Sequence, residues 1–442
     1  MLSIAHLAAQ LVNAHSVLLA YSGGLDSSVL LHQLVQLRNQ RPELQLRAVH
    51  VHHGLNPLAD GWVTHCEQQC ARWQVAFEVV NVQVDAREGG TEAAARTARY
   101  RAFSQLLRPE EVLLTAQHLD DQSETVLLAL KRGSGPAGLA AMPQQHRLGA
   151  NRHLRPLLGS RRSQLEAWAQ QHQLTWIEDD SNQDPRYDRN FLRLQIMPLL
   201  NTRWPHFASA VARSAELCGE QEALLDELLA ESLSALMDAE GSLAISPLLT
   251  MSEARRAALL RRWIARQQGS MPSRGALQRV WQEVACSRED AEPRLRLGSH
   301  EIRRFRDRLY WLPLWMPLRE RRLSWSSPWP PLTLPDGLGQ LLLGQRGMAL
   351  RAPRPHEPVS IRFHAQGTFH IVGRAGSRPL KKVWQELAVA PWLRERTPLL
   401  FYGECLVAAA GLFVTREGAP IATEAPWYLD WRQEKHHTGE PL

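Results

Sequence analysis

A glycine-rich turn between an apolar run and a helical stretch limits the folds open to this chain more than any other feature. The run Val17 to Tyr21 leads directly into Ser22-Gly23-Gly24-Leu25-Asp26-Ser27, and helical spacing follows from Ser28. Two adjacent glycines let backbone N–H groups approach an anion without a Cβ atom in the way, and the helix directs its positive end to the same place. The string predicts a phosphate-binding loop, here called the phosphate loop. A glycine turn with a capping Ser or Asp would explain the two glycines alone.

The phosphate loop differs from a Walker A motif, because it has no lysine to reach a γ-phosphate and carries an acid instead. Asp26 would lie beside the phosphates, and a carboxylate is favourable there only with a divalent cation between it and the anion. We therefore expect ATP as a substrate and Mg²⁺ at Asp26. The expected ATP-binding residues are Ser22, Gly23, Gly24, Leu25, Asp26, Ser27 and His50. The string resembles the signature of the N-type ATP pyrophosphatases, which adenylate an oxygen and release pyrophosphate.

The first 200 residues alternate short apolar runs with amphipathic stretches, which is typical of a parallel sheet with helices on both faces. The expected strands are Val17 to Tyr21, Leu44 to His52, Ala76 to Val82 and Val112 to Thr115. The expected helices are Ser27 to Arg38, Ala59 to Trp73, Thr91 to Leu107, Asp121 to Lys131 and Ser163 to His172. The apolar segment Leu174 to Ile177 is expected to extend the sheet.

Histidines gather where the second expected strand ends, in His50-Val51-His52-His53-Gly54-Leu55. Open parallel sheets bind ligands at this carboxyl edge. Three histidines in four residues could bind a metal, but no cysteine or further acid lies nearby in the sequence, so neither zinc nor an iron–sulfur cluster is expected. Nucleotide contacts or hydrogen bonds at the strand end are the favoured interpretation.

Acids gather where the fourth expected strand ends, in the segment from Gln117 to Thr125. Asp121 and Glu124 are three residues apart at the start of a helix, so they share one face. Helix capping is the alternative, since acids are favoured in a first turn. Asp120 and His118 exceed what a cap requires, and a functional site is therefore favoured.

Length and composition indicate several domains and a cytoplasmic protein. The chain has 442 residues, of which 44% are hydrophobic, more than one domain usually needs. It has neither a long uncharged apolar run nor the basic start of a signal peptide, so no membrane association is expected. Five cysteines without a Cys-x-x-Cys pair are interpreted as reduced thiols.

Charge is segregated in the second half of the chain. Residues 216 to 240 contain eight acids and no Lys or Arg, whereas residues 251 to 322 contain 17 arginines and eight acids. A solvated arginine-rich face is one interpretation, but clustered cations favour a surface that contacts a nucleic-acid backbone. We expect a catalytic domain at 1–215, a helical arginine-rich domain at 216–325, a small α+β domain at 350–430 and a disordered tail at 431–442.

Several motifs, taken together and in order, resemble those of the bacterial tRNA(Ile)-lysidine synthetases. They include the phosphate loop, the histidine and acidic segments above, Glu92 to Arg101, Arg132 to Gly135 and Asp188 to Arg193. The resemblance continues through Arg378 to Lys382 and Arg396 to Phe401, so it covers nearly the whole chain. It implies a PP-loop enzyme that uses ATP to join free L-lysine to the wobble cytidine of the CAU-anticodon isoleucine tRNA. It also suggests a homodimer.

The same resemblance implies roles for individual residues. Asp26 and Asp121 would be catalytic, and Asp121 with Glu124 would hold the ammonium group of lysine. The expected contacts to tRNA or to substrate anions are Arg99, Arg101, Arg189, Arg193, Lys381 and Lys382. Ordinary surface ion pairs are the alternative for the arginines.

Lys381 and Lys382 stand out within the sequence itself. They are two of only four lysines in a chain whose Lys and Arg residues total 51. An ammonium group is a compact point charge that arginine does not reproduce, so we expect this pair to contact tRNA phosphates.

Two rival functions are less consistent with the residues. A tRNA thiolase of the same superfamily would need reactive cysteines near the phosphate loop, and no cysteine accompanies the fourth strand. A non-catalytic RNA-binding protein on the same fold would not need Asp26, Asp121 and Glu124.

Overall fold

The computed structural model describes residues 2–54, 58–83, 91–288 and 291–433. The chain forms two compact units, Met1–Glu227 and Leu228–Pro441. The tail expected at 431–442 lies largely outside the described residues. Within the described ranges, no helix is both long and apolar enough to cross a membrane.

A six-stranded sheet, in the order β3-β2-β1-β4-β6-β5, organises the first unit. Its strands are β1 (Ser16–Ala20), β2 (Gln45–His52), β3 (Ala76–Asn81), β4 (Val112–Leu114), β5 (Gln145–Leu148) and β6 (Asn151–Leu154). All neighbours pair in parallel except β5, which runs antiparallel to β6. The expected parallel sheet is confirmed, with an antiparallel strand added at one edge.

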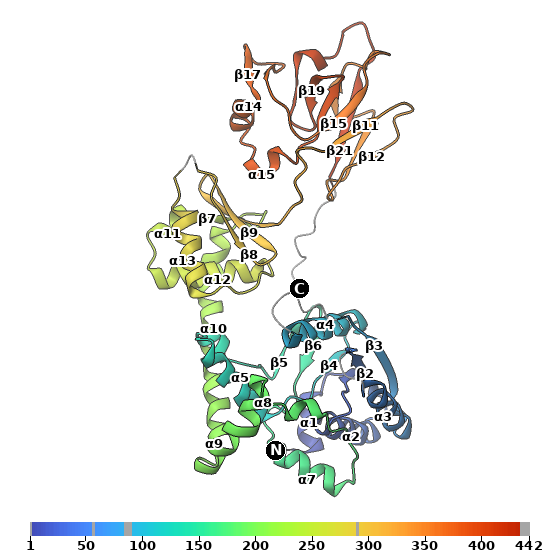
Figure 1. Ribbon diagram of the computed structural model, residues 1–442, viewed down its shortest axis with the longest axis vertical. Helices are drawn as coiled ribbons and strands as arrows, with labels where there is room; N and C mark the ends of the chain where they lie inside the picture. Colours follow the sequence, from blue (N-terminus) through green and yellow to red (C-terminus); the bar gives the residue numbers. More distant parts are fainter. Residues whose placement is uncertain (1, 55–57, 84–90, 289–290, 434–442) are drawn as a thin grey trace. The chain divides into compact units, whose positions relative to one another are not determined.

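Helices cover both faces of this sheet, as expected. They are α1 (Ile4–Gln10), α2 (Leu25–Gln40), α3 (Ala59–Arg72), α4 (Thr91–Leu106), α5 (Leu119–Lys131), α6 (Pro136–Leu139) and α7 (Arg162–Gln171). Val17 and Leu19 of β1 pack into a core with α1, α2, α3 and α7, while Leu18 packs with Phe103 of α4 on the other face. Figure 1 shows the helices around the sheet. Burial on both faces explains why β1 reads as a continuous apolar run.

The structure corrects one expected element, because Leu174 to Ile177 forms no strand. Leu174 packs into the core, and the main-chain N–H of Ile177 donates a hydrogen bond to the carbonyl of Gly23 at 2.9 Å. The segment therefore braces the phosphate loop. The sheet is extended by β5 and β6 instead, whose polar and basic residues hide a strand pattern from the sequence.

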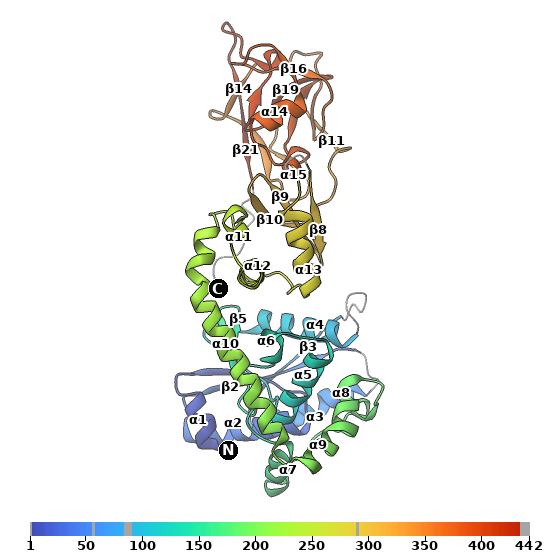
Figure 2. The same ribbon diagram turned by 90° about the vertical axis from the view of Figure 1, so that its left-hand side faces the viewer.

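A helical stretch links the two units. It contains α8 (Asp188–Phe191), a π-helical turn (Leu192–Ile196), α9 (Met197–Arg203) and α10 (Phe207–Leu236). Figure 2 shows α10 as one unbroken helix. This helix runs through residue 216, where a new domain is expected from the sequence.

The middle region confirms the expected helices and adds a sheet. Its helices are α11 (Ser246–Leu249), α12 (Glu253–Arg266), α13 (Arg274–Arg279) and a π-helical turn (Val280–Ala285). An antiparallel sheet of β7 (Leu243–Ala244), β8 (Arg294–Leu297), β9 (His300–Phe305) and β10 (Arg308–Pro313) packs against them. Arginines at alternate strand positions conceal these strands, because only isolated residues such as Leu295, Ile302 and Leu309 reach the core.

The C-terminal part is built mainly of antiparallel strands. Its elements are β11 (Arg322–Trp325), β12 (Leu332–Thr333), β13 (Gln340–Gly344), β14 (Met348–Leu350), β15 (Val359–Arg362), β16 (Thr368–His370), β17 (Ser377–Pro379), α14 (Leu380–Glu386), α15 (Pro391–Arg394), β18 (Leu399–Tyr402), β19 (Cys405–Ala409), β20 (Phe413–Val414) and β21 (Trp427–Arg432). The expected helix at Leu380 to Leu387 is confirmed as α14. Strands β11 to β13 precede residue 350, and β14 ends there. Nevertheless β11 pairs with β15, and β13 and β14 pair with β21, both of which follow residue 350.

A buried ion pair fixes the edge of the first sheet that lies opposite the phosphate loop. The carboxylate of Glu111, at 0% exposure, accepts hydrogen bonds from Arg47 at 2.7 and 3.0 Å, from Ser16 at 3.2 Å and from the N–H of Arg108 at 3.1 Å. Burial alone would raise the pKa of Glu111, but these hydrogen bonds outweigh it and hold the pKa below its usual value. The ionised pair therefore stabilises the folded chain.

We predict that Glu111→Ala lowers the free energy of unfolding by about 3 kcal/mol, because it removes a fully buried carboxylate and leaves the partly buried Arg47 with only the more distant Glu78 as an acidic partner. The folded-state pKa of Glu111 lies below the unfolded one. Its stabilisation is therefore complete above a pH of about 4.3 and is lost as the pH falls through the folded value. Denaturant unfolding at several pH values should show the gap between wild type and variant narrowing in acid. The exposed Glu43→Ala is the control, and an equal effect at both sites would contradict the assignment.

Candidate active site

The phosphate loop can adopt its observed path only with glycine at residue 23. Gly23 has φ of +82°, and a Cβ atom there would lie 2.6 Å from Cδ1 of Ile177 and 2.9 Å from Sγ of Cys66. The backbone is therefore pressed against α3 and against the segment after α7. Both neighbours hold the loop in place without covering it with a charged group.

Hydroxyl groups fix the rest of the loop. Ser27 Oγ donates to the carbonyl of Gly24 at 3.1 Å and lies 3.1 Å from Ser22 Oγ, while Ser28 Oγ donates to the carbonyl of Gly23 at 3.3 Å. The side chain of Leu25 is buried, so this residue offers a ligand only its main chain. These hydroxyls stabilise the backbone of the loop at the start of α2, and its contacts to a phosphate stay a prediction.

Asp26 has an unsatisfied oxygen beside the loop. Its Oδ1 is buried and has no hydrogen-bond partner among the described residues, while its Oδ2 lies 3.7 Å from Nε2 of His118 and 3.9 Å from Nη1 of Arg162. Burial raises the pKa of Asp26 and Asp121 adds to this effect, whereas His118 and Arg162 act against it. A cation next to Oδ1 would favour the ionised form of this carboxylate.

His118 and Asp121 form a reciprocal cap at the start of α5. The N–H of His118 donates to Oδ2 of Asp121 at 3.1 Å, and the N–H of Asp120 donates to Nδ1 of His118 at 3.2 Å. The capping alternative therefore holds for part of the acidic segment. It accounts for one oxygen of Asp121 and for no atom of Glu124.

Arg193 joins the two acids that share a face of α5. Its Nη2 donates to Oδ1 of Asp121 at 2.9 Å and to Oε2 of Glu124 at 2.9 Å, and its Nε donates to Oε1 of Glu124 at 2.8 Å. Glu124 is 1% exposed. Two buried carboxylates and one guanidinium thus form a compact cluster, and the expected proximity of the two acids is confirmed.

Burial and pairing act in opposite directions within this cluster. Burial raises the pKa of Glu124, and the hydrogen bonds from Arg193 act against that rise. Burial disfavours the charge on Arg193, yet Glu124 and Asp121 hold its pKa above the usual value. Arg189 lies 3.7 Å from Glu124 and donates to Thr125 Oγ1 at 3.0 Å. The pairing places both arginines at the acidic segment.

The histidines at the end of β2 lie beside the phosphate loop. Nδ1 of His50 is 3.0 Å from the carbonyl of Tyr21, the residue before the loop, and Nε2 of His52 is 3.3 Å from Oδ1 of Asp60. Burial lowers the pKa of His53 to about 4, and the charge of Arg99 adds to this shift. Arg99 therefore reaches this strand end, whereas Leu55 lies outside the described residues.

Three further arginines, Arg99, Arg101 and Arg162, lie outside the cluster formed by Arg193. Arg99 and Arg101 are exposed on α4. Arg162 was not identified as a site residue from the sequence. Its main-chain N–H donates a hydrogen bond to Oδ2 of Asp120 at 2.9 Å. Its sequence signal is the doublet Arg161-Arg162 at the start of α7, where a cation opposes the helix dipole.

The donor set at Asp26 fits Mg²⁺. Within the described ranges, no group of three or more His, Cys, Asp or Glu side chains is arranged to hold a metal. Mg²⁺ does not need such a group, because it usually binds one or two carboxylates together with substrate phosphates and water. The unpartnered Oδ1 of Asp26, next to the phosphate loop, supplies that kind of ligand.

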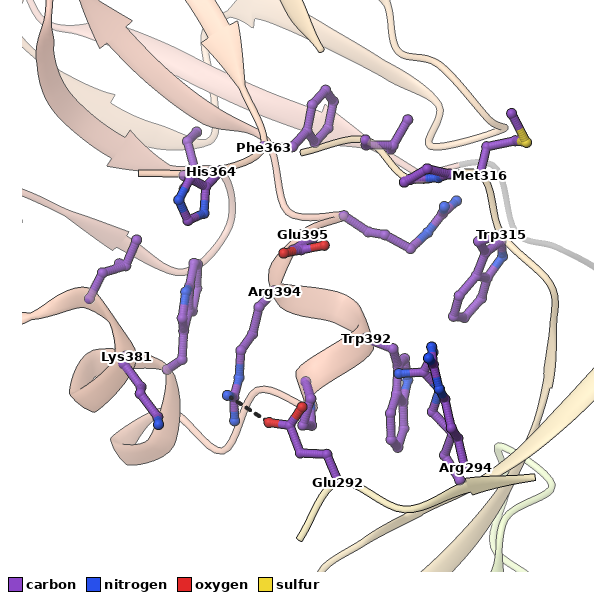
Figure 3. Close-up of a pocket in the computed structure, with 18 of the residues that line it drawn as sticks. Glu292, Arg294, Trp315, Met316, Phe363, His364, Lys381, Trp392, Arg394 and Glu395 are labelled. Atoms are coloured by element: carbon purple, nitrogen blue, oxygen red, sulfur yellow. Dashed lines mark ion pairs between the residues drawn. The ribbon is translucent and has the colours of Figure 1, made fainter. Parts of the chain in front are cut away.

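The second unit contains a mixed cationic and aromatic cavity of about 710 Å³. Lys381, on α14, and Trp315 lie on opposite sides of it in the view of Figure 3. Several of its charges are paired, including Arg394 with Glu292 at 3.7 Å. The cavity combines aromatic faces with cations and with the acids Glu292, Glu301 and Glu395.

Lys381 and Lys382 are both exposed at the start of α14. The structure therefore leaves both ammonium groups accessible on the second unit. Arg378, two residues earlier than the helix, is instead paired with Glu386. Contact of the lysine pair with tRNA phosphates stays a prediction.

Comparison with known families gives three matches along the chain. A PP-loop domain model matches residues 2–200, a TilS substrate binding domain model matches 243–310, and a TilS substrate C-terminal domain model matches 359–431. Among solved structures, U34-tRNA thiolase NcsA from Methanococcus maripaludis is 17% identical with a TM-score of 0.41, over 47% of this chain and 72% of that one.

Relatives similar along their whole length come from several bacteria. The tRNA(Ile)-lysidine synthase of Serratia proteamaculans is 64% identical over 97% of this chain and 98% of its own length. Those of Pectobacterium atrosepticum and Shigella flexneri are 62% and 60% identical, over 96% and 92% of this chain and 96% and 94% of their own lengths. With this identity over nearly the full length, and with all three domain models in order, the chain belongs to the tRNA(Ile)-lysidine synthase family.

Proposed function

We propose that this chain joins free L-lysine to C2 of the wobble cytidine in the CAU-anticodon isoleucine tRNA, with ATP as the energy source, so that the anticodon reads AUA. One observation carries the proposal. A loop suited to phosphates and a buried pair of carboxylates suited to an amine lie at the same edge of one sheet. The relatives of this chain act on tRNA. We therefore expect the reaction to take place in the cytoplasm, where tRNA, ATP and lysine are all present.

The first step forms a bond between O2 of the cytidine and the α-phosphorus of ATP. The bond to the bridging oxygen of the β-phosphate breaks, and pyrophosphate leaves with its electron pair. The N–H groups of the phosphate loop and the hydroxyls of Ser22 and Ser27 hold the phosphates in place for this displacement. No charged side chain of the loop other than Asp26 takes part.

Mg²⁺ bound to Asp26 would neutralise charge that develops on the departing pyrophosphate. The burial of Asp26 keeps one of its oxygens away from other side chains. Oδ1 of Asp26 has no protein partner among the described residues, and His118 and Arg162 contact only the side of Oδ2. The carboxylate is therefore oriented with one oxygen left for a cation.

The second step forms a bond between the ε-nitrogen of lysine and C2 of the cytidine. The bond from C2 to O2 breaks, AMP leaves with that oxygen, and the amine loses a proton. Asp121 and Glu124 would attract the ammonium group. Each carboxylate oxygen has two lone pairs, so the acids can accept from lysine while Arg193 stays in place.

Arg193 then has a second role that its geometry supports. Nε and Nη2 are used by the acids, and Nη1 makes no hydrogen bond within the described part of the chain. This nitrogen is free to donate to a phosphate or to the carboxylate of lysine. The acids thus hold the guanidinium while one of its nitrogens reaches the substrates.

The thiolase alternative fits the thiols poorly. Cys66 and Cys70 are buried, and burial raises the pKa of each thiol to about 12. A thiol with such a pKa carries almost no thiolate at neutral pH and is a poor nucleophile. Cys66 instead packs against Gly23.

The proposal is tested by incubating the protein with CAU-anticodon isoleucine tRNA, ATP, Mg²⁺ and radiolabelled lysine. We expect label in the RNA and one pyrophosphate released for each lysine joined. Elongator methionine tRNA, which has the same anticodon, is the control and should stay unlabelled. Pyrophosphate release without label in the RNA would refute lysine as the nucleophile.

Variants at Asp26 and at Glu124 should impair different steps of the reaction. We predict that Asp26→Asn slows tRNA-dependent pyrophosphate release by about 10²-fold or more, because the metal loses its charged ligand. Glu124→Gln should keep that release but raise KM for lysine by about 10- to 150-fold, the range for one hydrogen bond to a charged group.

The matched control is Glu166→Gln, which removes an exposed acid paired with Arg162 at 3.1 Å. It should change neither step appreciably. Equal loss of both steps in Glu124→Gln, with an unchanged melting temperature, would contradict the division of roles.

The lysine pair is tested on tRNA binding alone. We predict that changing Lys381 and Lys382 together to Ala weakens tRNA binding while leaving ATP binding intact. The slope of log K against log salt should fall by about one for each phosphate that the variant no longer neutralises. Lys131→Ala, at an exposed lysine paired with Asp188, is the control. An unchanged tRNA affinity in the double variant would contradict the proposed contact between this lysine pair and tRNA phosphates.

A further inference from the structure

Arg155 is buried without an acid. It follows β6 directly and is 3% exposed. Its Nη1 donates to the carbonyl of Pro143 at 2.6 Å and lies 3.3 Å from Nδ1 of His146, and its Nε is buried without a partner. Within the described ranges, no carboxylate pairs with it. Buried charges in proteins are normally paired, because an unpaired one is costly to take out of water.

The neighbours of Arg155 add positive charge. Arg96 of α4 is exposed, and its guanidinium carbon lies 5.0 Å from the ring centre of Tyr100. The rings of His146 and His153 are 4.6 Å apart. The buried hydroxyl of Tyr100 lies beside Arg155, where it acts against the fall in the pKa of Arg155 that burial causes. Burial lowers the pKa of His153 to about 3, and Arg155, His146 and Arg96 add to that shift. The cluster therefore holds two fixed cations and neutral histidines.

Partly buried arginines of this unit have more partners than Arg155. Arg47 is paired with Glu111, and Arg193 with both Asp121 and Glu124. Arg38 donates to the carbonyls of Trp73 and Gln74. Arg155 is more deeply buried than these three and has no acidic partner within the described ranges, so an anion from outside the protein would stabilise its charge.

Arg155 lies at the same edge of the sheet as the groups proposed to react. Strand β6 pairs with β4, and β4 pairs with β1, so Arg155 lies at the same carboxyl edge as the phosphate loop. Two strand spacings amount to about 10 Å. Gln122, next to Asp121 on α5, exchanges hydrogen bonds of 2.9 and 3.0 Å with the main chain of Met142. The loop that carries Pro143 is therefore tied to the helix that carries the acids.

We propose that Arg96, Arg155 and the hydroxyl of Tyr100 form a subsite for a phosphodiester of the RNA strand next to the reacting cytidine. This inference rests on the proposed function, which supplies the RNA. A phosphodiester bears one negative charge and two acceptor oxygens, which suits a guanidinium fork and a phenol. Arg96 is the accessible member, and Arg155 lies behind it with an unused donor. The subsite would hold the strand while its base enters the active site.

A double-mutant cycle tests the contact. Full-length CAU-anticodon tRNAs are assembled with one neutral methylphosphonate at each phosphate near the wobble cytidine in turn. We expect Arg96→Gln to weaken binding of unmodified tRNA by about 10-fold and to lower the salt slope by about one. At one position the methylphosphonate should weaken wild-type binding by a similar factor, yet add nothing to the variant.

The control variant is Arg147→Gln. Arg147 is exposed on β5 and pairs in register with Arg152, whereas His146 pairs with His153, so it faces away from the subsite. Its effect should add to that of every methylphosphonate. Arg155→Lys, which keeps the charge but loses the fork, should show the same coupling as Arg96→Gln provided its melting temperature is retained.

Three outcomes would overturn the subsite. Additive effects of Arg96→Gln at every phosphate would mean that no phosphodiester binds there. A raised KM for ATP with additive RNA effects would assign the cations to ATP. Unchanged tRNA binding with a lowered melting temperature in Arg155→Lys would make Arg155 a structural clamp. Lysine incorporation by the wild type is measured alongside, so failure of the proposed function is seen separately.

Discussion

One guanidinium group sits between two buried carboxylates, and the arrangement of the candidate active site depends on it. Asp121 and Glu124 lie close enough to repel each other, and Arg193 offsets this repulsion by donating hydrogen bonds to both. Arg193 also ties the π-helical turn after α8 to α5. The interaction therefore sets the charge of the cluster and the position of its backbone at once.

The sheet explains why these groups meet. Strand β1 is buried on both faces, so its only exposed features are its ends, and β4 and β6 lie parallel beside it. Residues that directly follow these parallel strands therefore start from the same edge of the sheet. Asp26, Asp121 and Arg155 are far apart in the sequence and share this edge for that reason. At the opposite edge, the charges of Arg47 and Glu111 neutralise each other.

The sequence predicted those features that depend on local pattern. The phosphate loop, the two-sided helical cover and the shared face of Asp121 and Glu124 follow from glycine chemistry and from helical spacing. The β5–β6 hairpin and the sheet of the middle region were missed because arginines and other polar residues interrupt their alternation. Partners distant in sequence, such as Arg193 on Glu124 or Ile177 against Gly23, depend on tertiary packing that no local pattern encodes.

In the proposed reaction, three acids at one edge divide two tasks, with a metal at Asp26 and an amine at Asp121 and Glu124. A crystal structure of the protein with ATP, Mn²⁺ in place of Mg²⁺ and L-lysine tests this division most directly, because manganese is located by its anomalous scattering. We predict manganese on Oδ1 of Asp26 and the ε-nitrogen of lysine within hydrogen-bonding distance of Asp121 and Glu124. Manganese away from Asp26, or lysine held by other residues, would contradict the division of tasks.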